Sequence, residues 1–194
     1  YKIFIYLYIF LFSKAILASS SASFLISQTA FNSYDFSQVL YEYNTNQNED
    51  YKSDYLDELI SAVVTEDILV AENIAEKILS IEPDNQEAKL VQMTRAFKNN
   101  QLTELNSLRF DSANNKNDLL EFLFYQDNKI KTKSSISNSF LDIVRSSYSN
   151  RDVNYSQNYN FLLFYASLAI FLNSENFEAV FIKGQLLQII NDYL

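Results

Sequence analysis

The stretch AENIAEKILSIEPDNQEAKL, residues Ala71–Leu90, holds the only proline of the chain between two runs of good helix formers. Before Pro83 the apolar residues recur every three to four positions, as on one face of an amphipathic helix. A residue that precedes proline avoids the α region of the backbone, so the first helix is predicted to end there. Asp84, followed three residues later by Glu87, resembles a capping box with Asp84 as the N-cap of the next helix. Pro83 therefore predicts a boundary between two helices.

Composition favours helices throughout the chain. Its 194 residues include one glycine and one proline. All-β folds need both residue types for tight turns, and dinucleotide-binding folds need glycine-rich loops. With 48% hydrophobic residues, the chain can bury a core in one or two domains. We therefore predict an all-α fold.

Helical periodicity continues on both sides of the opening stretch. We expect helices over residues 53–67, 67–82, 86–99, 102–110, 118–126, 139–148, 161–172 and 177–194, with a linker over 150–160. The run FLLFYASLAIFL, residues 161–172, has no polar face, so we expect neighbours to cover it on more than one side. It is too short to be a membrane span.

Charge is unevenly distributed along the chain, and the net charge is −9. Residues 42–87 hold 13 acids and 2 bases, whereas residues 89–151 hold 10 bases and 6 acids. This balance disfavours nucleic acid as a partner, because phosphate contacts need a clustered basic surface. The acidic half is either a solvated helix face or a surface for a basic partner.

Missing residue types exclude much chemistry. Without cysteine or histidine there is no thiol nucleophile, no Ser-His-Asp triad and no zinc site with nitrogen or sulfur ligands. The carboxylates Asp54, Asp57 and Glu58 lack the spacing and glycine turn of a calcium loop, so we expect them on a solvated helix surface. We predict no catalytic residue, no metal and no cofactor, and therefore no enzyme.

The amino terminus resembles a secretory signal peptide. Lys2 precedes an apolar run over Ile3–Phe12, and small residues follow at Ala18, Ser20 and Ala22. The run is short for a membrane span, and Lys14 interrupts the apolar stretch that follows. We expect residues 1–20 to direct export, with a periplasmic location. An uncleaved membrane anchor and a buried core helix are the alternatives.

The spacing of the helix pairs resembles the tetratricopeptide repeat, a 34-residue helix-turn-helix. With Pro83 placed at the proline position of the repeat, one unit covers Lys52–Asn85. Tyr55 then fills the aromatic position of the first helix, and Ala71 fills the small position of the second. Gly184 fits the glycine position of a further first helix, whereas Met93 and Leu105 depart from the pattern.

The resemblance implies an α-α superhelix, a solenoid of antiparallel helix pairs, similar to exported alphaproteobacterial tetratricopeptide-repeat proteins. Residues 21–113 would form the helix pairs, 114–176 an irregular helical region, and 177–194 the first helix of a truncated repeat. A first helix alone exposes an apolar stripe, and solenoid ends need a capping element. We therefore expect the sequence to be a fragment of a longer protein.

In function, the resemblance implies a non-catalytic scaffold that binds a protein or peptide in a groove lined by first helices. The groove positions would be Gln28, Phe31, Ile60, Thr94, Phe97 and Lys98. For Ile60 and Phe97 the favoured alternative is an ordinary core position between neighbouring helices, whereas we expect Thr94 and Lys98 to be exposed. Any contact with a membrane would come only from the signal peptide or an uncleaved anchor. The sequence does not identify the partner.

Two other functions fit the same residues. The chain could be a non-catalytic superhelical domain of a larger cell-envelope enzyme whose catalytic part lies beyond Leu194. It could also be a purely structural domain without a groove ligand. The flanking sequence would separate the first of these from an interaction scaffold.

Overall fold

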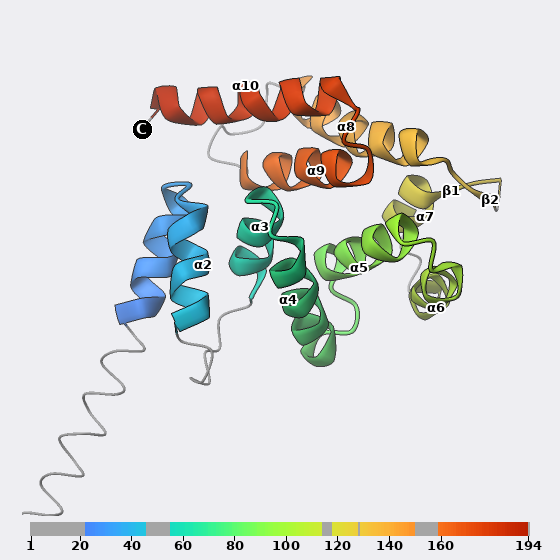
Figure 1. Ribbon diagram of the computed structural model, residues 1–194, viewed down its shortest axis with the longest axis horizontal. Coiled ribbons are helices and arrows are strands. Elements are labelled where there is room, and N and C mark those ends of the chain that lie inside the picture. The colour runs from blue at the N-terminus through green and yellow to red at the C-terminus, as the bar shows by residue number, and fades with distance from the viewer. Residues whose placement is uncertain (1–21, 46–54, 114–117, 128, 150–158, 194) are drawn as a thin grey trace, which may run out of the picture.

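The computed structural model describes residues 22–45, 55–113, 118–127, 129–149 and 159–193 (Figure 1). Most of these residues are helical, which confirms the all-α prediction. A helix over residues 22–32 precedes α2 (Phe36–Thr45), α3 (Leu56–Val64), α4 (Ile68–Ile81), α5 (Gln86–Lys98), α6 (Leu102–Ala113), α7 (Asp118–Phe124), α8 (Lys133–Ser149), α9 (Tyr159–Leu172) and α10 (Phe177–Tyr193). The predicted signal peptide over 1–20 and most of the predicted linker lie outside the described residues.

Helices that follow one another in sequence pack against each other from α2 to α6. Only a few residues join most of these helices, and short connections make neighbours in sequence neighbours in space. The pair α3 and α4 matches the pattern around Pro83, since both apolar stripes are buried. The prediction of packed helix pairs is confirmed for this part of the chain.

The turn inside each of the first three helix pairs has the same backbone geometry. The carbonyl oxygens of Ala30, Ala62 and Ala96 each accept the N–H of the residue five positions later, at 2.8, 2.9 and 2.8 Å. The residue before that donor is left-handed in every case, at Tyr34 (φ 59°), Glu66 (φ 67°) and Asn100 (φ 59°). This is a Schellman motif, which ends a helix and satisfies its last carbonyl groups. The three alanines are 32 and 34 residues apart, so the local geometry repeats along the chain.

A second kind of turn precedes both α5 and α10. Its last residue is Asn85 in one case and Asn176 in the other. Each asparagine N–H donates to the carbonyl three residues earlier, at 3.1 and 3.0 Å. Each side-chain Oδ1 accepts the N–H three residues later, at 3.0 and 3.2 Å. The start of α10 therefore matches the start of α5, and the sequences Asn-Gln-Glu-Ala and Asn-Phe-Glu-Ala correspond.

The position of the cap corrects the prediction made from Pro83. α4 ends at Ile81, as expected, but Asn85 and not Asp84 is the N-cap of α5. Pro83 and Asp84 form the turn itself, so the helix begins one residue later than the capping-box pattern predicts. Asp84 instead accepts a hydrogen bond from Lys89 Nζ at 3.0 Å.

The middle of the chain departs from the predicted helices. α7 ends at Phe124, and Tyr125–Gln126 (β1) pairs antiparallel with Lys129–Ile130 (β2). The left-handed Asp127 (φ 50°) supplies the turn that separates the two strands. α8 begins at Lys133, six residues before its predicted start, because Thr132 Oγ1 accepts the N–H of Ser135 at 3.2 Å and caps it.

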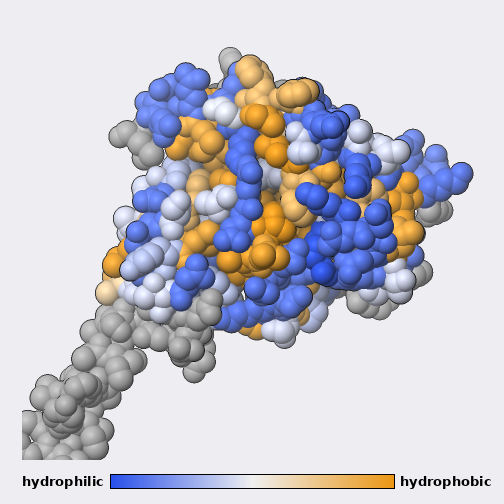
Figure 2. Space-filling model, viewed as in Figure 1, coloured by the Kyte–Doolittle hydropathy of each residue, from blue (hydrophilic) through white to orange (hydrophobic). Residues whose placement is uncertain are grey.

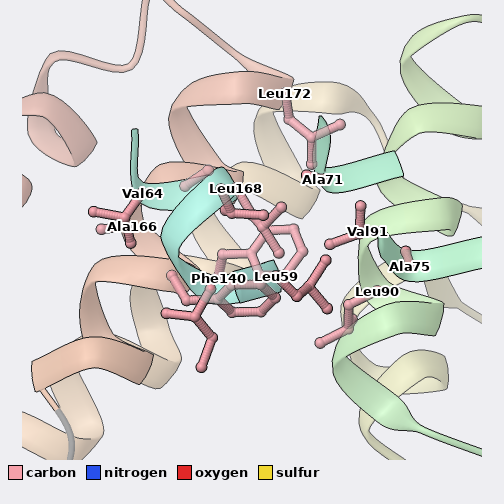
Figure 3. Packing of buried hydrophobic residues seen from close by; sticks show 14 of the residues in the cluster. Leu59, Val64, Ala71, Ala75, Leu90, Val91, Phe140, Ala166, Leu168 and Leu172 are labelled. Atoms are coloured by element: carbon pink, nitrogen blue, oxygen red, sulfur yellow. The ribbon is translucent and has the colours of Figure 1, made fainter. Parts of the chain in front are cut away.

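The hydrophobic core surrounds α9, which packs against α3, α5, α8 and α10 (Figure 1). Figure 3 shows Leu59 of α3 close to Phe140 of α8 and Leu168 of α9, with Leu90 of α5 facing them. All four side chains are buried. Helix α9 is apolar on all sides and must be covered on all sides. The prediction that residues 161–172 are covered on more than one side is confirmed.

Candidate interaction surface

The six predicted groove residues do not share one open surface. Ile60 and Thr94 are fully buried, and no hydrogen-bond partner reaches Thr94 Oγ1. Phe97 is partly buried, with its ring edge-on to Phe124 at 6.4 Å between centroids. The alternative interpretation of Ile60 as an ordinary core residue is therefore correct.

Lys98 is held against α9. Its Nζ donates to the Phe171 carbonyl at 2.6 Å and lies 3.7 Å from the centroid of the Phe171 ring. Burial lowers the pKa of the Lys98 ammonium, and the nearby Lys133 lowers it further. The expectation of exposure was wrong for Thr94, which is buried, whereas Lys98 is half-buried, because α9 packs on α5.

The remaining two residues lie near the amino-terminal helix pair. Gln28 Nε2 donates to Asp57 Oδ2 at 2.7 Å, which links the first helix to α3. Phe31 is partly buried, edge-on to Phe36 at 6.2 Å between ring centroids. Glu58, expected on a solvated surface, is buried, so that expectation was wrong for this residue. Asp54 lies outside the described residues.

Helix α9 occupies the side of α3 and α5 on which the resemblance places a groove. The carboxyl-terminal helices are tied to this side by polar contacts as well as apolar ones. Lys183 Nζ of α10 donates to the Val64 carbonyl at 2.9 Å and to Glu66 Oε1 at 2.8 Å. Ile60 and Thr94 are thus inside the protein, and a ligand cannot reach them in this arrangement.

An apolar stripe remains uncovered on the outer side of α10. Its members are Phe177 (82% exposed), Val180 (49%), Phe181 (64%) and Leu187 (37%). They recur at positions i, i+3, i+4 and i+10, which lie on one side of a helix. Figure 2 shows hydrophobic residues at the top of the molecule, where α10 lies in Figure 1. We call these four residues the α10 stripe.

Helix α5 shows what usually covers such a stripe. Since α5 and α10 begin in the same way, position 85 corresponds to position 176. Phe177 corresponds to Gln86, which is exposed as well. The residues that correspond to Val180, Phe181, Gly184 and Leu187 are Lys89, Leu90, Met93 and Ala96, and all four are buried. α4, α6 and α9 pack against α5. Most of this helix side is therefore covered in α5 and exposed in α10.

The other exposed apolar side chains are less organised. Phe24, Leu25 and Ile26 are consecutive, and the last two line a shallow depression shared with the polar Thr29, Ser33 and Gln38. Leu69 of α4 is 75% exposed and isolated from them in sequence. Neither feature is a stripe along one helix.

The described residues contain few groups that could catalyse a reaction or hold a metal ion. Among them, no three acidic side chains gather where they could hold a metal ion. The pKa of Tyr165 is raised to about 12, chiefly by burial and then by the charge of Glu87, but its ring packs edge-on against Phe164 inside the protein. No helix in the described ranges is both long and apolar enough to cross a membrane.

Comparisons with protein families, with curated proteins and with solved structures give no match. The sequence alone indicates that the last helix carries an apolar stripe. It does not single that stripe out, because other helices such as α3 and α4 carry one as well. The repeated Asn-x-Glu-Ala start of α5 and α10 is the signal that would have done so.

Proposed function

We propose that this protein is a non-catalytic helical-repeat scaffold of the tetratricopeptide type, which mediates protein–protein or protein–peptide interaction after export to the periplasm. The observation that carries the proposal is the uncovered α10 stripe. Four large apolar side chains exposed along one helix are typical of a binding surface, whereas single exposed apolar residues are normal.

Two repeating features support the repeat architecture. The Schellman turns at Ala30, Ala62 and Ala96 are spaced by about one 34-residue unit. The capped turns before α5 and α10 favour α10 as the first helix of a further unit. A superhelix of antiparallel pairs accounts for both features with one kind of building block.

The stripe, and not the predicted groove, is the surface that we assign to binding. The groove side of α3 and α5 packs against α9 within the same chain. A ligand there would have to displace α9 and break the contact between Lys98 and Phe171. The α10 stripe needs no displacement.

A site-specific photo-cross-linker tests the proposal. Placed at Phe181 in the full-length protein in its native cells, it should capture one or a few reproducible proteins. Leu69 is the matched control, because it is also large, apolar and exposed but lies on α4. The same capture at both positions, or no protein captured at Phe181, would contradict a binding role for the stripe.

Export is tested separately. A fusion of residues 1–30 to a reporter that works only outside the cytoplasm should be active. Replacing Ile5 and Leu7 by Asp should abolish that activity, because the apolar run is the part that an export machinery recognises. An inactive wild-type fusion would refute export and would leave the binding proposal standing.

A further inference from the structure

No further inference is drawn: the strongest candidate, the shallow apolar depression that Leu25 and Ile26 line between the amino-terminal helix and α2, is an unpartnered apolar face, and nothing in the described residues shows what covers it.

Discussion

Lys183 of α10 donates a hydrogen bond to the carbonyl oxygen of Val64 at 2.9 Å, although 119 residues separate the two in sequence. The same ammonium group reaches Glu66 Oε1 at 2.8 Å. Val64 is the last residue of α3, so its carbonyl is one of those that a helix leaves without an internal partner. Helix α10 thus supplies the hydrogen-bond donor for a carbonyl group at the end of α3.

Replacing Lys183 by Met should lower the free energy of unfolding by about 1–3 kcal/mol, because the buried Val64 carbonyl loses its partner. Chemical denaturation measures this change. Glu66→Gln is the control and should cost less than about 1 kcal/mol, since the Glu66 side chain is 61% exposed. Equal losses in the two variants would mean that the ion pair, and not the carbonyl contact, stabilises α10.

The repeated turn predicts opposite effects at two adjacent asparagines. Asn100 is left-handed, a conformation that glycine adopts without cost, so Asn100→Gly should raise the free energy of unfolding by a few tenths of a kcal/mol, up to about 1. Asn99 has a negative φ of −86°, which needs no glycine, and Asn99→Gly should lower the free energy of unfolding by up to about 1 kcal/mol. Thermal unfolding of the pair checks the difference. A lower stability for Asn100→Gly would contradict the Schellman geometry.

Thr94→Val should stabilise the protein by about 1 kcal/mol. The Thr94 hydroxyl is buried without a partner, and removing such a group relieves its desolvation cost. Ser137→Ala is the contrasting variant, because Ser137 Oγ donates to the Ala169 carbonyl at 2.9 Å and its loss should destabilise. If Thr94→Val instead abolished partner binding at unchanged stability, the originally predicted groove would be the functional site.

Gly184→Ala should raise the free energy of unfolding by about 1 kcal/mol. A Cβ at this position meets no other atom, and alanine is a better helix former than glycine by about 1 kcal/mol. Chemical denaturation measures the change. A lower stability of the alanine variant would show that the added methyl group meets an atom at this position.

Tyr165 predicts a specific loss of stability in alkali. Its pKa in the folded protein is raised to about 12 from the ordinary value of about 10. Between pH 10 and 12 the unfolded state loses the phenol proton while the folded state keeps it. The free energy of unfolding therefore falls as the pH rises through this range. Tyr165→Phe should lose about 2 kcal/mol less than the wild type over this range. Parallel pH profiles for the two proteins would refute the shifted pKa.

Local patterns predicted the helix pair around Pro83 well. The apolar spacing of Ala71, Ile74 and Ile78 fixed both the type and the buried side of α4, because burial of a stripe is decided within one helix. The lack of a polar face on residues 161–172 likewise predicted a helix covered on more than one side. These features depend on neighbours in sequence.

The groove was not predictable in the same way. An apolar residue such as Ile60 looks the same in sequence whether a ligand or another helix covers it. The covering helix α9 begins almost a hundred residues later, and no local pattern states which helix meets which. The hydrogen bond from Lys98 to the Phe171 carbonyl could not be predicted either. Every residue has a backbone carbonyl, so the residue type at position 171 does not indicate that its carbonyl accepts this bond.

The distance in sequence between α3 and its cover affects how the protein is made. Translation releases the amino-terminal helices first. Leu59 of α3 and Leu90 of α5 face α9 (Figure 3). Part of their surface is therefore exposed to solvent until residues 159–172 have been synthesised. A nascent chain that pauses before that point exposes these apolar side chains to chaperones and to other nascent chains on the polysome. Helix α9 is thus needed to complete the burial of helices that are synthesised long before it.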